Sequence, residues 1–220
     1  MKLIIIGGVA AGASAAAKAR RCNEDAEIIM FEKGQDISYA TCGLPYYLSG
    51  VIAKRDDLLI TTGEFFKRRF NIDVRTGHDV QRIDRRARKI HFTDLATGAS
   101  GEEGYDKLII ATGASAIVPP VPGVDLPFVF ALKTLEDTDR IFDYTKRSEP
   151  KHVVVVGGGL VGMEAAESFV VGRARVSVVE LMSQVLTFLD PEMAVVVHHH
   201  LGEKGVDLYR PLSFRRGFQY

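Results

Sequence analysis

The sequence predicts an α/β fold, because one supersecondary pattern occurs twice in the chain, about 150 residues apart. In each copy a short apolar strand leads into a glycine-rich turn, a helix and a second strand that ends in an acidic residue. This βαβ unit of about 30 residues is typical of a Rossmann-like three-layer domain. Between the copies, short apolar runs separated by turn residues predict a β-meander. We therefore expect two Rossmann-like domains, the first of which carries the meander.

The first expected domain covers residues 1–116. Its βαβ unit consists of strand Lys2–Ile6, helix Ala11–Arg21 and strand Glu27–Phe31. Further elements predicted in this domain are helix Gly63–Phe70, strand Ile72–Arg75, and the meander segments 78–84, Lys89–Thr93 and Tyr105–Ala111, the last of which reads as a buried strand.

The second expected domain covers residues 117–220. The densest run of proline and glycine, residues 117–123, marks the boundary between the two domains. The second βαβ unit follows as strand His152–Val156, helix Val161–Val171 and strand Arg175–Val179.

The glycine motif at residues 157–162 has the full G-x-G-x-x-G pattern directly after four valines. Gly157 allows the tight turn, Gly159 lets the backbone approach a pyrophosphate, and Gly162 lets the helix pack on the strand. Glu180, about 20 residues further on, can accept a ribose 2′-hydroxyl and repels a 2′-phosphate. The motif therefore predicts a site for NADH rather than NADPH. The residues expected to bind it are Gly157, Gly159, Leu160, Val161, Gly162 and Glu180.

The glycine motif at residues 7–12 departs from this pattern at one position. It keeps Gly7 and Gly12 but has Val9 where the middle glycine is expected. Glu32 again supplies an acid after the second strand. The buried strand at 105–111 runs into small residues up to Gly113, which permit close approach of a cofactor, although alone they would indicate an ordinary strand end. Together these features predict a second dinucleotide site.

Composition and charge argue against several classes of protein. Lys plus Arg is 28 and Asp plus Glu is 28, so the net charge is 0, which argues against a nucleic-acid-binding protein. Neither a membrane span nor a secretory leader is visible, so we expect a cytoplasmic protein. Cys22 and Cys42 lack the spacing of a zinc or disulfide motif, so we expect no metal. The run 198–200 of histidines lies in a helical pattern, where adjacent side chains diverge and cannot share one ion.

Cys42 lies between the two glycine motifs, in the run from Ser38 to Tyr46. Gly43 and Pro45 after it fit the start of a helix, whose dipole favours the thiolate, the nucleophilic form of cysteine. A buried structural thiol is the alternative. The surrounding motif favours a redox role for Cys42, whereas Cys22 ends the first helix without such a motif and is expected to be a bystander.

These motifs resemble those of the FAD-dependent pyridine nucleotide–disulfide oxidoreductases, and within them the single-cysteine branch of CoA-disulfide reductases, NADH oxidases and NADH peroxidases. The matching segments are 7–12, 38–46, 105–113, 122–123, 153–162 and 189–193, which together cover residues 1–208. The resemblance implies FAD at the first site and NADH at the second. It also implies electron transfer to a disulfide or persulfide substrate, with CoA disulfide as the expected one. The electrons would pass to a mixed disulfide of Cys42 with CoA, so that the substrate thiol serves as the second sulfur.

The resemblance also implies roles for individual residues. FAD contacts are implied for Gly7, Gly8, Val9, Ala10, Ala11, Gly12, Glu32, Lys33, Val80, Ala111, Thr112 and Gly113. Substrate contacts are implied for Ser14, Lys18, Arg21, Ser38 and Thr41, where cations suit the phosphates of CoA.

One position separates the members of the branch. Ala10 stands where the resemblance implies a histidine in oxidases and peroxidases, so a CoA-disulfide reductase is favoured. NADH oxidase or peroxidase is one alternative. A non-catalytic nucleotide-binding remnant is another, because the resemblance implies a longer chain with a dimerisation domain that forms a homodimer. We interpret residues 209–220 as a truncated or frameshifted tail with neither strand nor family pattern.

Overall fold

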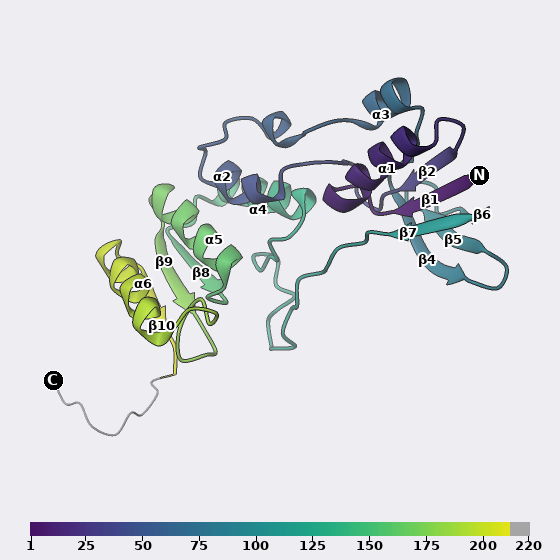
Figure 1. Cartoon of the computed structure of the whole chain (residues 1–220). Helices are drawn as coiled ribbons and strands as arrows, with labels where there is room; N and C mark the ends of the chain where they lie inside the picture. The colour runs from purple at the N-terminus through teal and green to yellow at the C-terminus, as the bar shows by residue number, and fades with distance from the viewer. Residues whose placement is uncertain (212–220) are drawn as a thin grey trace. The chain divides into compact units, whose positions relative to one another are not determined.

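The structure, a computed structural model, describes residues 1–211, and the chain divides into two compact units (Figure 1). The first unit comprises Met1–Thr41 and Arg55–Pro119, and the second comprises Cys42–Lys54 and the chain from Pro120 onward. The segment 42–54 lies within the expected first domain, yet its helix makes its contacts in the second unit.

The first unit is built around a parallel sheet of order β3-β2-β1-β7. The strands are β1 (Lys2–Ile6), β2 (Glu27–Phe31), β3 (Asp73–Arg75) and β7 (Lys107–Ile110). The central strands β1 and β2 are near-continuous runs of Ile, Leu, Met and Phe, because both faces of the sheet are buried. The predicted bounds of β1 and β2 are confirmed, whereas β3 and β7 are shorter than predicted.

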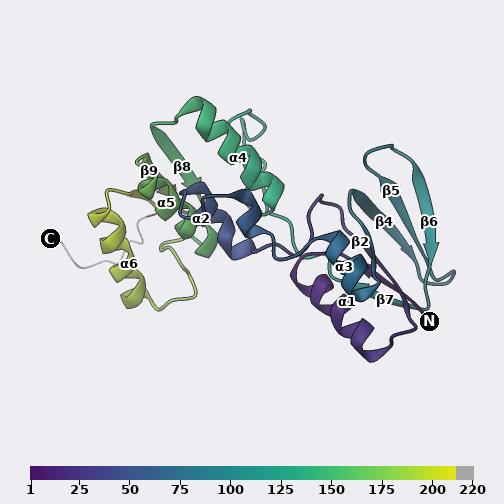
Figure 2. The same ribbon diagram turned by 90° about the horizontal axis from the view of Figure 1, so that it is seen from above.

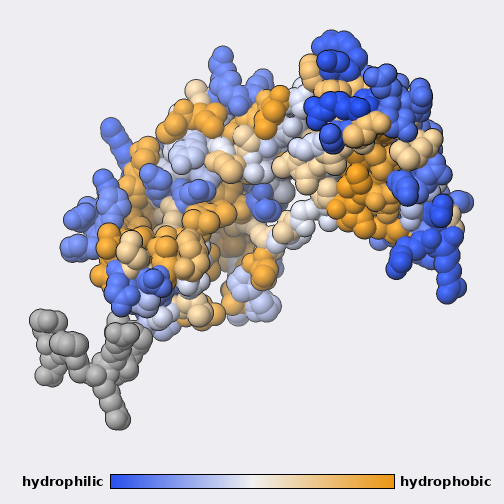
Figure 3. Space-filling model, viewed as in Figure 1, coloured by the Kyte–Doolittle hydropathy of each residue, from blue (hydrophilic) through white to orange (hydrophobic). Residues whose placement is uncertain are grey.

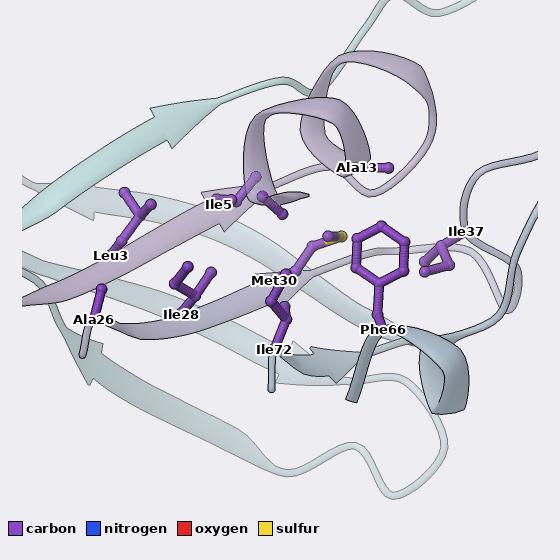
Figure 4. Packing of buried hydrophobic residues seen from close by; sticks show 10 residues of the cluster. Leu3, Ile5, Ala13, Ala26, Ile28, Met30, Ile37, Phe66 and Ile72 are labelled. Carbon is purple, nitrogen blue, oxygen red and sulfur yellow. The ribbon is translucent and has the colours of Figure 1, made fainter. Parts of the chain in front are cut away.

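Helices α1 (Ala10–Cys22) and α3 (Gly63–Phe70) cover one face of this sheet. Helix α1 presents the small side chain of Ala13, which lets its backbone come close to the strands. Figure 4 shows Phe66 of α3 lying beside Met30 and Ile37 in the same cluster. The bounds predicted for α3 are confirmed, and α1 extends one residue beyond its predicted range at each end.

The other face is covered by an antiparallel sheet of order β4-β5-β6. Its strands are β4 (His78–Asp84), β5 (Lys89–Asp94) and β6 (Ser100–Gly104). Two segments of the predicted meander, 78–84 and Lys89–Thr93, lie in this sheet. The third predicted segment does not, because β7 pairs in parallel with β1, and the third strand is instead β6, which was not predicted. Ile90 of β5 is fully buried against Ile4 and Phe31 of the parallel sheet. Figure 2 shows the three layers of this unit, with α1 and α3 on one side of the parallel sheet and the antiparallel sheet on the other.

The second unit has a parallel sheet of order β10-β9-β8, formed by β8 (His152–Val156), β9 (Arg175–Val179) and β10 (Asp207–Tyr209). Helix α5 (Leu160–Val171) packs against β8 and β9, and α6 (Pro191–Glu203) packs against β10. Strand β10 corrects the expectation that no strand includes Tyr209, because parallel pairing with β9 forms it. The rest of the expected tail, residues 212–220, lies outside the described residues.

Helix α4 (Leu135–Ser148) is absent from the elements predicted above. Its start is nevertheless marked in the sequence, because Thr134 and Asp137 form a capping box. The Thr134 hydroxyl accepts from the Asp137 N–H, and the Asp137 carboxylate accepts from the Thr134 N–H.

A short helix, α2 (Leu44–Leu48), follows the 3₁₀ turn η1 (Thr41–Gly43), and a second 3₁₀ turn, η2 (Arg55–Leu58), comes after it. Helix α2 packs against α4 and α5. Tyr47 stacks on Phe142 of α4, with ring centroids 4.6 Å apart. These contacts hold α2 in the second unit.

Hydrophobic residues also reach the surface of both units (Figure 3). On β8, Val154 and Val156 are 53% and 73% exposed, while the alternate residue Val155 packs against α5. The apolar side chains of β8 therefore point to both faces of the sheet, and only one face is covered by the described chain. No helix among residues 1–211 has the length and apolar character needed to cross a membrane.

Candidate functional site

The first glycine turn joins β1 to α1 in a space that accepts only glycine at two positions. Gly7 has a φ of +98°, and a Cβ at this residue would lie 2.2 Å from the Ala111 carbonyl oxygen. A Cβ on Gly12 would lie 1.7 Å from the Gly7 carbonyl oxygen. The turn is therefore tight enough to bring the N-terminus of α1 against the ends of β1 and β7.

The N-terminus of α1 is left without a cap. Val9 occupies the N-cap position and makes no side-chain hydrogen bond there, and the first turn holds no acidic residue. Ala10 and Ala11, which open the helix, are exposed. Helix α3 is built differently, since the Thr62 hydroxyl accepts from the Phe65 N–H. The free N–H groups and positive dipole end of α1 are thus available to an anion such as a phosphate.

Glu32 is held beside this turn by two backbone donors. Its Oε2 accepts from the Gly8 N–H at 2.6 Å, and its Oε1 accepts from the Gly34 N–H at 2.8 Å. Each carboxylate oxygen has a second lone pair, so both can still accept from a ligand hydroxyl. Lys33, also predicted to bind the cofactor, pairs with Asp79 at 3.2 Å.

The remaining residues predicted around the first site come from β4 and from the end of β7. Val80 follows Asp79 on β4, and its half-buried side chain packs against the core cluster between the two sheets. After β7, Ala111 is half-buried, whereas Thr112 and Gly113 are exposed, and Gly113 has a φ of +68°.

The second glycine turn repeats this geometry between β8 and α5. Gly157 has a φ of +105°, and a Cβ on Gly162 would lie 1.9 Å from the Gly157 carbonyl oxygen. Gly159 occupies the N-cap position without a side-chain cap, and no atom lies within 4 Å of the place where its Cβ would be. Leu160 and Val161, which follow, are exposed. The N-terminus of α5 is therefore open to an anion in the same way.

Glu180 mirrors Glu32. Its Oε2 accepts from the Gly158 N–H at 2.6 Å, and its Oε1 accepts from the Met182 N–H at 2.7 Å. In both units, an acid at the end of the second strand accepts from the second residue of the glycine turn.

Residues predicted to contact the substrate lie on α1 and on the segment that leads to Cys42. Ser14, Lys18 and Arg21 are all exposed, and their spacing of four and three residues places them on one face of α1. Ser38 donates its backbone N–H to the Gly8 carbonyl oxygen at 3.0 Å and has a φ of 49°, in the left-handed region. Thr41 is exposed.

Cys42 is an exposed free thiol in the η1 turn. The residues that follow it are anchored, because the Ser168 hydroxyl of α5 donates to the Pro45 carbonyl oxygen at 2.7 Å. Ser168 is buried, and nothing in its local sequence marks it as a partner of the cysteine segment, 123 residues away. Cys22 is also free and exposed.

The three consecutive histidines of α6 face different surroundings. His198 Nε2 accepts from the Val185 N–H at 3.2 Å, whereas His200 lies 3.6 Å from Glu203 on the same helix. Within residues 1–211, no group of three His, Cys, Asp or Glu side chains is arranged to hold a metal ion.

Comparison with known proteins places this geometry in one family. The model of the family "Pyridine nucleotide-disulphide oxidoreductase" matches residues 1–215, which extends past the point where the sequence motifs were expected to fade. An NADH oxidase of Methanocaldococcus jannaschii is 40% identical over 97% of this chain and 48% of its own length. A coenzyme A disulfide reductase of Staphylococcus haemolyticus is 33% identical over 93% of this chain and 46% of its own length.

Solved structures give the same result. The reduced CoADR-RHD of Bacillus anthracis has a TM-score of 0.93 and 42% identity, and the match covers 95% of this chain and 38% of that one. A NAD-dependent persulfide reductase from A. fulgidus has a TM-score of 0.91 and 37% identity, over 96% of this chain and 39% of that one. This chain spans about half the length of the curated relatives it matches. From the two repeated nucleotide turns and these matches, the chain belongs to the pyridine nucleotide-disulphide oxidoreductase family.

Proposed function

We propose that this chain is the nucleotide-binding part of a flavoprotein that passes electrons from NADH through FAD to a small disulfide, such as CoA disulfide, with Cys42 as the reacting sulfur. The observation that supports this proposal is that one kind of site occurs twice. Each site has an uncapped helix N-terminus and a carboxylate that accepts a hydrogen bond from the second residue of the glycine turn. An exposed free thiol lies between the two turns in the sequence.

The first turn fits the adenosine and pyrophosphate end of FAD. The N-terminus of α1 offers N–H groups to phosphate, and Glu32 has lone pairs for the ribose hydroxyls. The half-buried Val9 replaces the middle glycine, and it sits at the N-cap, so the ligand would approach beside its side chain. When bound, FAD accepts a hydride from NADH and delivers an electron pair to sulfur.

The second turn favours NADH over NADPH. Glu180 carries a negative charge where a 2′-phosphate would lie, and residues 181–189 contain no lysine or arginine to accept that phosphate. The α5 N-terminus and the open space at Gly159 fit the pyrophosphate.

Cys42 would act as a nucleophile. Its thiolate attacks one sulfur of the disulfide, a new S–S bond forms between Cys42 and that sulfur, and the other sulfur leaves as a thiolate. Two electrons and a proton then regenerate the Cys42 thiolate and release the second thiol. The exposure of Cys42 suits a substrate that comes from solution.

A second candidate function is NADH oxidase, because the M. jannaschii relative with that name is 40% identical to this chain. Against it stands Ala10 at the start of α1, where the side chain supplies no imidazole for oxygen or peroxide chemistry. A third candidate is a non-catalytic nucleotide-binding remnant, since the chain spans about half the length of its curated relatives.

Flavin absorbance and oxygen uptake separate the three candidates. The chain is purified, supplied with FAD and desalted. Retained yellow flavin that NADH bleaches under anaerobic conditions supports an enzyme, and a colourless protein supports the remnant. Oxygen consumption that follows NADH addition without a disulfide supports the oxidase. Our proposal expects bleaching by NADH and reoxidation on addition of CoA disulfide.

A further inference from the structure

The loop formed by residues 181–189 lies against the second glycine turn. The Leu186 N–H donates to the Gly158 carbonyl oxygen at 2.8 Å. Val185 is fully buried, and its Cγ1 lies 2.7 Å from where a Cβ on Gly158 would be. Glu180 precedes the loop and accepts from the Met182 N–H within it. The position of this loop therefore fixes both the turn and its carboxylate.

The backbone of the loop is strained at one residue, so hydrogen bonds from other parts of the unit are needed to hold its conformation. Leu186 has a φ of 48°, a left-handed conformation that costs a branched residue about 1–2 kcal/mol. Two side chains from the C-terminal part of the unit hold the loop. His198 Nε2 accepts from the Val185 N–H, and the Arg210 guanidinium donates to the Ser183 carbonyl oxygen at 2.8 Å.

The bond to His198 also fixes the protonation state of its ring. A backbone N–H can only donate, so Nε2 must present a lone pair and the single ring proton must lie on Nδ1. An imidazolium has no such lone pair, so protonation would break the bond.

The charges around His198 oppose its protonation. Burial lowers the pKa of His198, and the positive charge of Arg210 lowers it further. The loop 181–189 contains no titratable or charged residue, and His200 on the same helix is directed to Glu203. Because the pKa of His198 in the folded protein lies below the ordinary histidine value of about 6.5, the neutral ring holds the loop at and above that pH. Its contribution is lost as the pH falls through the lowered pKa.

We propose that His198 is a positioning residue of the second nucleotide site: its neutral imidazole holds the loop 181–189, and through it Glu180, against the glycine turn. Protonation or removal of the ring releases the loop and weakens NADH binding. This inference rests on the proposed function, in which that turn binds NADH.

The test combines the affinity for NADH with the exchange of backbone amide hydrogens in the loop. Wild type, H198L, H198Q and H199Q are titrated with NADH between pH 5.5 and pH 8, and hydrogen exchange of residues 182–187 is measured at pH 7. Gln can accept from the Val185 N–H but does not titrate. Leu can neither accept this hydrogen bond nor titrate. His199 is an exposed neighbour on the same helix and serves as the matched control.

We expect the affinity for NADH to depend on whether the side chain at position 198 can accept a hydrogen bond from the Val185 N–H. The Kd for NADH of wild type and H199Q stays constant from pH 8 to pH 6.5 and rises below pH 6.5, by at most about five-fold, as one lost hydrogen bond would give. H198Q keeps a tight and pH-independent Kd, whereas H198L is about five-fold weaker at every pH and exchanges its loop amides faster. Wild-type affinity and exchange in a folded H198L would overturn the inference. Faster loop exchange in H198L, together with no NADH binding by any variant, would contradict the proposed function but leave the loop anchor intact.

Discussion

Replacing Gly162 with alanine tests whether the second glycine turn holds a dinucleotide. Gly162 lies in the first turn of α5, and the new methyl carbon would stand 1.9 Å from the Gly157 carbonyl oxygen. An ordinary contact is about 3.5 Å. The obstructing atom belongs to the backbone of the turn, so no side-chain rotation can relieve the overlap, and α5 must move away from β8.

The expected cost follows from that overlap. Overpacking in a tight interior costs about 1–3 kcal/mol. Because the methyl group would meet a backbone atom, which cannot rotate away, we expect a cost at the upper end of this range. If the displaced helix N-terminus loses its contact with the pyrophosphate, the Kd for NADH rises about 100-fold, which corresponds to about 3 kcal/mol.

The assay is anaerobic calorimetric titration of NADH into the protein whose FAD has first been reduced with dithionite, so that binding is measured without hydride transfer, with bound flavin measured in the same samples. Gly172→Ala is the matched control, because a Cβ there would meet its nearest atoms at 3.4 Å, an ordinary contact. Gly12→Ala is the reciprocal variant in the first turn, where the new methyl carbon would stand 1.7 Å from the Gly7 carbonyl oxygen, and it should lose FAD instead. A folded Gly162→Ala protein with wild-type NADH affinity would refute the assignment of this turn.

Two further predictions concern the cysteine segment and the stability of the first unit. Ser168→Ala removes the hydroxyl donor to the Pro45 carbonyl oxygen, so we expect slower reduction of CoA disulfide with unchanged NADH affinity. Unchanged turnover would show that α2 is held without this bond. Glu103→Gln should lower the free energy of unfolding by about 1–2 kcal/mol at pH 7, because the carboxylate pairs with Lys2 at 2.6 Å and Arg75 at 3.0 Å. Burial raises the pKa of Glu103, but the hydrogen bonds and charges of Lys2 and Arg75 outweigh it, so the net pKa is lowered. The contribution of the Glu103 carboxylate to the free energy of unfolding is therefore present above about pH 4.5 and is lost as the pH falls through the lowered pKa. Urea unfolding at pH 7 and pH 3.5 checks this, and an equal deficit at both pH values would contradict it.

The two βαβ units could be predicted closely from sequence because their signals are local. The four valines before Gly157 and the glycine spacing specify a strand, a turn and a helix within one short segment. The same holds for the first unit, where the predicted bounds of β1 and β2 agree with the structure.

Elements and contacts that depend on distant partners were not predictable in this way. Strand β10 is three residues long and exists because Leu208 pairs with Val178 of β9. The contacts of Ser168 with Pro45, and of His198 with Val185, join residues that carry no shared motif. Helix α4 is a different case, since its capping box was readable from the sequence.

The proposed sulfur chemistry at Cys42 is tested most directly by anaerobic NADH oxidation in the FAD-loaded protein, with and without CoA disulfide, in wild type and Cys42→Ser. We predict that wild type consumes one NADH per disulfide and almost none without it, because the disulfide is the electron acceptor. Cys42→Ser should keep its flavin and still be bleached by NADH, but should not reduce the disulfide. Disulfide reduction by Cys42→Ser at the wild-type rate would contradict the role of this thiol.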